Sequence, residues 1–210
     1  MQANHNKMTS PARKYDSHSQ TLLSMWPLLL IGLVVIVVGI TGDSGRLALR
    51  YDRLAVESGQ WWRLLSGHIV HLGWQHALLN LAGLTLVILL FPDEYRAGQW
   101  LTLVVVCVAV ISAGFLFLRP DLNWYVGLSG VLHGLFWAGA IRWLSRREAE
   151  GYLLVAFLIG KLIWEQMKGA LPLSVATSGG PVVVDAHLYG AVAGIGLALL
   201  FLRDWRSTHR

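Results

Sequence analysis

The stretch YVGLSGVLHG, residues 125–134, decides how the rest of the chain is interpreted. Ser129 stands between Gly127 and Gly130, at the head of an otherwise apolar run. In a soluble helix such a serine is an ordinary N-cap. At the start of a membrane helix, a hydroxyl flanked by glycines that weaken the helix calls for a packing or chemical reason.

The composition is that of an integral membrane protein. Hydrophobic residues make up 55% and charged residues 14%, with a mean hydropathy of +0.53, whereas charged residues form about a quarter of a typical soluble domain. Ten tryptophans fit the same class, because Trp favours the membrane interface. The basic residues lie between the apolar runs as topology signals do, so no nucleic-acid surface is expected. The single cysteine, Cys107, predicts a buried, inert thiol and excludes an intrachain disulfide.

The sequence predicts an all-α membrane protein with six transmembrane helices, since each span needs about 20 mainly apolar residues. The expected spans are Met25–Thr41, Ile69–Phe91, Trp100–Leu118, Val126–Leu144, Gly151–Met167 and Val184–Leu202. We expect a flexible cytoplasmic tail over residues 1–20, one membrane domain over 21–204 and a cytoplasmic tail over 205–210. The first span could be a signal peptide, but its exit ITGDSG lacks a cleavage signal, which favours a retained anchor.

The distribution of Lys and Arg predicts that both termini are cytoplasmic. The inner segments would hold Lys7, Arg13, Lys14, Arg96, Arg142, Arg146, Arg147, Arg203, Arg206 and Arg210. The outer segments would hold Arg46, Arg50, Arg53, Arg63, Arg119 and Lys168. The long first outer loop, residues 42–68, contains SGQWWRLLSGH, and its tryptophans predict a segment lying in the membrane interface.

Four polar residues share a depth near the outer surface in this topology. They are Ser129 on the fourth span, His187 on the sixth, and His76 and Asn80 on the second. Polar groups within a bilayer are costly, so they are functional candidates by default. Taken singly, each has an ordinary alternative: a serine bonded to its own backbone, or a histidine that only stabilises helix packing.

Paired glycines predict how the fourth and sixth spans meet. Gly130 and Gly134 share one helical face, and Gly190 and Gly194 share another. Such faces let membrane helices approach closely, which would bring Ser129 within hydrogen-bond reach of His187. Gly127 would free the backbone before the helix, and Gly130 would remove bulk beside the hydroxyl.

These residue types are those of nucleophilic catalysis. A serine hydroxyl needs a base to take its proton, and a neutral His187 can supply one. His76 and Asn80, on one helical face, and the N–H of Ser129 are candidate donors to an oxyanion. Asp185 is the nearest carboxylate in sequence to His187, but it would face away on a helix. The sequence therefore predicts a Ser–His dyad rather than a triad.

The arrangement resembles the rhomboid family of intramembrane serine proteases. The matching pieces, in order, are W62-R63, H71-x4-H76-x3-N80, G127-L128-S129-G130, and A186-H187 followed by Gly190 and Gly194. The resemblance implies a six-helix bundle with a water-filled cavity open to the outer side. It implies Ser129 as nucleophile, His187 as base, His76 and Asn80 in the oxyanion hole, and supporting roles for His71 and Arg63.

The stretches GLSGVLHG, KLIWEQ and AHLYGAVAG look like one branch of that family, the rhombosortases. This branch implies exported bacterial substrates anchored by a C-terminal tail, with a Gly-Gly-type motif, one membrane helix and a basic end. It implies cleavage near that motif at the periplasmic face of the inner membrane. Substrate identity, oligomeric state and the choice between hydrolysis and transfer to another amine stay open.

One position departs from the family pattern. Many rhomboids carry a tyrosine four residues after the serine, where this chain has His133. His133 shares a helical face with Ser129, so it is a rival base. We favour His187, because His133 would lie about 6 Å deeper along the helix axis, and we expect His133 to contact the His187 ring.

The sequence also allows interpretations other than a protease. His68, His71 and His76 lack the carboxylate or Cys partners of a metal site, so no metal or cofactor is expected. Lys161 and Glu165 predict an intrahelical ion pair, or a pair that biases a substrate gate. A client-binding pseudoprotease would usually lack the serine or the histidine, and a small transporter would show broken helices in two matching halves.

Overall fold

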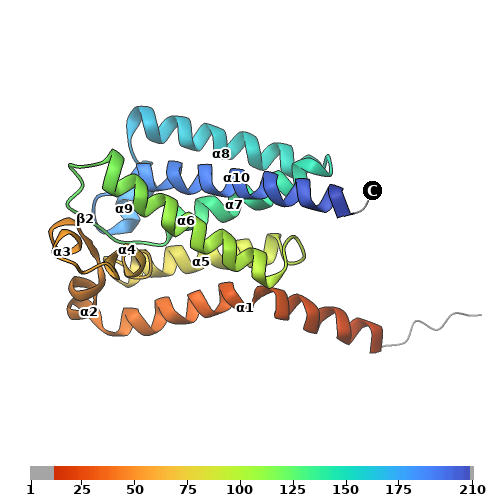
Figure 1. Cartoon of the computed structure of the whole chain (residues 1–210), viewed down its shortest axis with the longest axis horizontal. Coiled ribbons are helices and arrows are strands. Elements are labelled where there is room, and N and C mark those ends of the chain that lie inside the picture. Colours follow the sequence, from red (N-terminus) through yellow and green to blue (C-terminus); the bar gives the residue numbers. More distant parts are fainter. Residues whose placement is uncertain (1–11, 209–210) are drawn as a thin grey trace, which may run out of the picture.

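The computed structural model describes the backbone of residues 12–208 and the side chains of residues 23–203 except Leu173 and Thr177. Its long helices are α1 (Ala12–Ile40), α5 (Trp74–Leu90), α6 (Ala97–Leu118), α7 (Ser129–Ser145), α8 (Ala149–Lys168) and α10 (Val184–Thr208). They run along the length of the molecule, and α1 begins at the same end at which α10 finishes (Figure 1). Each corresponds to one of the six predicted spans.

The short elements gather at the opposite end of the molecule (Figure 1). They are α2 (Gly42–Leu49), α3 (Arg53–Glu57), α4 (Arg63–Ser66), α9 (Pro172–Ser178) and two strands, β1 (Tyr51–Asp52) and β2 (Trp124–Tyr125). The strands pair antiparallel, with Tyr51 opposite Tyr125. The pair was not predicted, because two residues are too few to show an alternating pattern.

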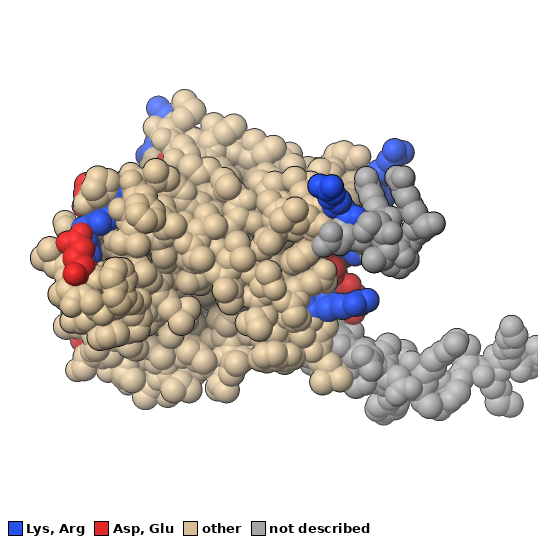
Figure 2. Space-filling model, viewed as in Figure 1, with Lys and Arg blue, Asp and Glu red and all other residues tan. Residues whose placement is uncertain are grey.

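Three helices of the described chain are long and apolar enough to cross a membrane by length and composition alone. They are α1 over Leu23–Ile40, α6, and α10 over Val184–Arg203. Helix α5 is apolar but has only 17 residues, α7 has 17, and α8 includes Lys161 and Glu165. On the face shown in Figure 2, charged residues lie at the two ends and leave an uncharged belt between them.

Several helix ends differ from the prediction. Helix α5 begins at Trp74 rather than Ile69, because Gly73 is extended at its start. Helix α1 begins at Ala12, so residues 12–20 of the expected tail have a helical backbone; residues 1–11 lie outside the described part. Helix α10 continues to Thr208, since no Gly or Pro follows Gly196, and the last two residues of the expected tail lie outside the description.

Helix α7 is the most enclosed part of the core. Val131, Ala138 and Ala140 are fully buried, and α7 packs against α5, α6, α8 and α10. Its neighbours supply large side chains such as Phe91 and Trp100, which are also fully buried. Helix α7 is therefore held in place by four other helices.

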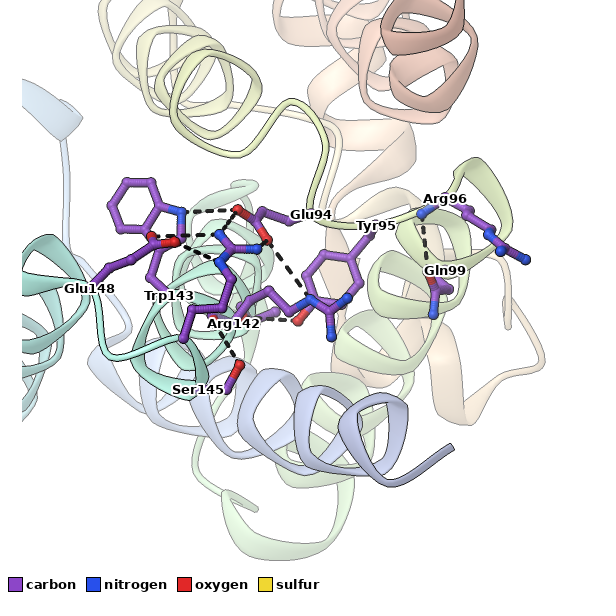
Figure 3. A network of polar contacts seen from close by, with 10 residues as sticks. Glu94, Tyr95, Arg96, Gln99, Arg142, Trp143, Ser145 and Glu148 are labelled. Carbon is purple, nitrogen blue, oxygen red and sulfur yellow. Dashed lines mark hydrogen bonds and ion pairs between the residues drawn. The ribbon is translucent and has the colours of Figure 1, made fainter. Parts of the chain in front are cut away.

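A polar network closes the end of the bundle at which α7 finishes (Figure 3). We call Glu94, Arg142, Trp143, Arg146 and Glu148 the Glu94 cluster. Arg146 donates to both oxygens of Glu94, and Trp143 Nε1 donates to Oε1 at 3.0 Å. Because Glu94 precedes α6, while its partners lie in the last turn of α7 and just after it, the cluster joins the end of α7 to the turn before α6.

Candidate active site

Ser129 is the first residue of α7, and the turn before it is tied down on both sides. Gly127 has φ +122°, a conformation that glycine adopts far more readily than other residues. Its N–H donates to Gly67 O at 3.0 Å, and its carbonyl accepts from Tyr125 Oη at 2.6 Å. The β1–β2 pair and these bonds lock the turn against the first loop, so Ser129 has a fixed starting point.

Helices α7 and α10 meet along the two glycine faces, as the spacing predicts. A Cβ on Gly190 would overlap the carbonyl oxygen of Gly130, and one on Gly194 would overlap that of Gly134. A Cβ on Gly134 would lie 2.7 Å from Gly190 O. No side chain fits between the two backbones here, so the closeness of the helices depends on these glycines.

The close approach brings Ser129 and His187 together. Ser129 Oγ lies 3.0 Å from His187 Nε2, and His187 is buried, with 3% of its surface exposed. The hydroxyl is thus within hydrogen-bond distance of an imidazole nitrogen that can accept its proton. The sequence prediction that these two side chains meet agrees with this geometry.

The expectation that no carboxylate orients His187 is wrong. Glu165 Oε2, from α8, lies 2.9 Å from His187 Nδ1, and the Glu165 side chain is fully buried. Asp185 instead pairs with Arg119. Sequence reasoning missed Glu165 because it is 22 residues from His187 and on another helix. The available signal was a charged pair, Lys161 and Glu165, inside an apolar segment.

Lys161 and Glu165 form the intrahelical ion pair that their spacing predicts. Lys161 Nζ binds Oε1 of Glu165, the oxygen not used by His187. The Lys161 side chain is 16% exposed. The carboxylate therefore has one partner on each oxygen, the Lys161 amino group on one side and the His187 imidazole on the other.

His133 packs on His187, as expected, and is occupied elsewhere. The two rings are stacked, with centroids 4.0 Å apart and planes 12° from parallel. His133 Nδ1 lies 2.7 Å from Ser129 O, and because a carbonyl only accepts, this nitrogen carries a proton. His133 thus contacts the backbone of Ser129, whereas His187 contacts the hydroxyl.

His76 and Asn80 come from α5. The ring of His76 faces the turn before Ser129, since a Cβ on Gly127 would lie 3.1 Å from His76 Nε2. Asn80 is buried, and its Nδ2 donates to His76 O at 3.0 Å within the same helix. His76 is therefore the nearer of the two to the turn that carries Ser129.

The supporting residues of the first loop hold its backbone in place. Arg63 Nη1 donates to Leu47 O at 3.0 Å and to Arg50 O at 2.9 Å. His71 lies before α5 and packs edge-on against His76, with ring centroids 4.9 Å apart. Arg63 thus ties together the loop that the turn before Ser129 rests on.

The histidines weighed as metal ligands have other surroundings. His68 is buried, its Nε2 lies 3.2 Å from Ser112 Oγ, and burial lowers its pKa to about 4. The metal-like grouping among the described residues is His133, Glu165 and His187, whose donor atoms lie within 4.8 Å of one another. These three are already bonded to each other, to Lys161 or to Ser129.

Comparison with known proteins points to one family. The Rhomboid domain matches residues 58–204. The chain is 30% identical over 151 residues to the rhomboid-protease homologue YdcA of Bacillus subtilis (strain 168), covering 70% of each chain. It is 27% identical over 180 residues to the rhomboid protease GlpG of two Klebsiella pneumoniae strains, covering 83% of this chain and 62% of theirs.

Proposed function

The chain is a member of the rhomboid family of intramembrane serine proteases, and we propose that Ser129 is its nucleophile and His187 its general base. The observation that carries this assignment is the 3.0 Å separation of Ser129 Oγ and His187 Nε2. The placement of Ser129 at the start of the most enclosed helix, α7, supports it, because the hydroxyl is held in one position relative to the base on α10.

The proposed reaction begins when Ser129 Oγ attacks the carbonyl carbon of the scissile bond and its proton passes to His187 Nε2. A tetrahedral intermediate with a negative oxygen results. His187 returns the proton to the leaving amine as the C–N bond breaks, which leaves an acyl-enzyme on Ser129. Water then attacks this ester, with His187 again as base, and restores the hydroxyl.

We propose that the oxyanion is stabilised by the N–H of Ser129 and by His76 and Asn80. The N–H points out of the first turn of α7, where the helix dipole favours a negative charge. The ring of His76 lies beside Gly127, in the turn next to the nucleophile, which supports its role. Asn80 Nδ2 gives one of its two hydrogens to its own helix, so the second hydrogen is the one that it would donate to the oxyanion.

We propose six membrane spans, with both termini cytoplasmic and Ser129 toward the periplasm of the bacterial inner membrane. The common end of the start of α1 and the finish of α10 supports this topology (Figure 1). Large exposed apolar side chains on helices other than α1, α6 and α10 support lipid contact there as well. Examples are Leu78 on α5 and Leu153 and Phe157 on α8, with 59%, 73% and 63% of their surfaces exposed.

The proposed substrates are exported proteins held by a C-terminal membrane anchor with a Gly-Gly-type motif and a basic end. The resemblance of GLSGVLHG, KLIWEQ and AHLYGAVAG to the rhombosortase branch supports this class. A nucleophile near the outer face would cut such an anchor at its small-residue motif and free the protein. The basic end would lie at the cytoplasmic side, as positive charges near membrane helices do.

The test is co-expression of this protein with a reporter that carries such a tail. Wild type is compared with Ser129→Ala, His187→Ala and His133→Ala at equal membrane levels. We expect cleavage by wild type and His133→Ala only. Mass spectrometry of the new C-terminus locates the cut and detects any added amine.

Each other outcome has one meaning. Cleavage that persists in Ser129→Ala refutes the nucleophile. Cleavage of a general rhomboid substrate, but never of this tail, refutes the substrate class and keeps the protease. Binding of the anchor without cleavage of either substrate would make the chain a client-binding protein.

A further inference from the structure

We propose that Glu165 is a positioning residue for the Ser129–His187 pair and that Lys161 holds this carboxylate in place. The proposal rests on the proposed function, because it assigns a role to groups that act through His187. It extends the two-residue site to four side chains in a row: Lys161, Glu165, His187 and Ser129. These come from α8, α10 and α7.

The burial of Glu165 calls for an explanation. The Glu165 side chain is fully buried, and a buried carboxylate without partners is strongly unfavourable. Each of its oxygens has one partner, Lys161 Nζ on Oε1 and His187 Nδ1 on Oε2. A buried ion pair gains little stability compared with apolar packing, so a stability role alone explains it poorly.

The contact with Glu165 also decides which nitrogen of the His187 ring carries the proton. An ionised carboxylate only accepts hydrogen bonds, so the 2.9 Å contact requires a proton on Nδ1. In the neutral ring Nε2 is then the free acceptor, and Nε2 is the atom 3.0 Å from Ser129 Oγ. Glu165 thus selects the one tautomer that can take the serine proton.

The proposed reaction also creates a positive charge on His187. When Nε2 takes the proton, His187 becomes a cation in a buried site. The charged or titratable groups around it are Glu165 and Lys161 from α8, His133 from α7 and His76 from α5. Glu165 is the one anion of these four, so it alone offsets the new charge. Lys161 keeps the carboxylate ionised and fixed before that moment.

A peptide-independent probe tests this inference. The full chain in detergent micelles is treated with a fluorophosphonate, which forms an Oγ–P bond with Ser129 and releases fluoride. Rates are measured across pH for wild type, Glu165→Gln and the matched control Glu150→Gln, an exposed position on the same helix. Ser129→Ala reports whether labelling is specific.

We expect Glu165→Gln to label about 100-fold or more slowly, as when the acidic member of a serine triad is replaced by its amide. The pH of half-maximal rate should move lower, because without the carboxylate a proton on His187 is less favourable. Glu150→Gln should match wild type in rate and in pH profile. A change of packing alone would lower the amount of labelled protein without moving the pH of half-maximal rate.

A second variant guards against misfolding. Glu165→Gln leaves the partly buried Lys161 without its anion, whereas the double variant Lys161→Met with Glu165→Gln leaves no unpaired charge. We expect the double variant to fold and to label as slowly as the single one. Wild-type rate and pH profile in either variant would overturn the role of Glu165 while the Ser129–His187 assignment stands. Loss of specific labelling in wild type would instead refute the proposed function.

Discussion

Two buried glutamates lie near opposite ends of the bundle, and they differ in their partners. Glu94 accepts from Arg146 and Trp143, with Arg142 Nε 3.8 Å from its Oε2 (Figure 3). Glu165 faces Lys161 and an imidazole. Guanidinium groups stay charged at any ordinary pH, so Glu94 can only hold its neighbours together. An imidazole changes its charge during proton transfer, so Glu165 can act on chemistry.

The same helix connects both ends, which makes the comparison testable. Helix α7 begins at Ser129 and ends at Ser145, next to Arg146 of the Glu94 cluster. Changes at the Ser129 end should affect reactivity first, and changes at the Glu94 cluster should affect stability first.

Gly190→Ala should disrupt the contact between α7 and α10 at the Ser129 end of the bundle. Its added Cβ would overlap Gly130 O, so α7 and α10 must separate. A displacement of 1 Å costs about 100-fold in rate, and overpacking costs about 1–3 kcal/mol in unfolding free energy. Labelling rate and thermal unfolding measure the two effects. Gly196→Ala is the control, since a Cβ there meets nothing within 4 Å; equal behaviour of both variants would contradict the prediction.

Glu94→Gln should weaken the other end alone. Lost hydrogen bonds to charged groups cost about 2 kcal/mol, and Arg146, with 45% of its side chain exposed, keeps water and Glu148 as partners. Unfolding in detergent should show this loss. Labelling of the folded fraction should keep its wild-type rate and pH profile. A shifted pH profile would mean that the two ends are coupled.

Lys161→Met should slow labelling about tenfold, which corresponds to about 1.4 kcal/mol. The carboxylate of Glu165 keeps its contact with His187 but loses the cation that fixes its other oxygen. Lys168→Met, at the exposed end of α8, is the matched control. A rate equal to that of the control would show that Glu165 needs no second partner.

Trp143→Phe should have the smallest effect, about 1 kcal/mol in stability. It removes the N–H that donates to Glu94 at 3.0 Å but keeps an aromatic ring against Phe91. Activity should not change. A loss of more than the Glu94→Gln variant shows would mean that ring packing, rather than the hydrogen bond, stabilises this end.

The sequence predicted the features that follow a regular spacing along the chain. Apolar runs located the long helices, and glycines four apart located the seam that brings Ser129 to His187. The contact of Glu165 with His187 was missed because contact between α8 and α10 depends on how the helices are rotated against each other, which no local pattern records. The starts of α5 and α7 were misplaced for a local reason, since Gly73 and Gly127 interrupt the helices without interrupting hydropathy.

Arg53 fastens the first loop to the end of α6. Its guanidinium donates to Phe115 O, Arg119 O and Leu122 O, around the end of α6, while Trp61 and Trp62 expose 61% and 55% of their surfaces. Tryptophans settle at the lipid headgroups, so we expect a loop fastened in this way to fix the depth of Ser129 in the bilayer. The bond that is cut would then be measured from the lipid surface, and a thicker bilayer should present a different residue of the same anchor.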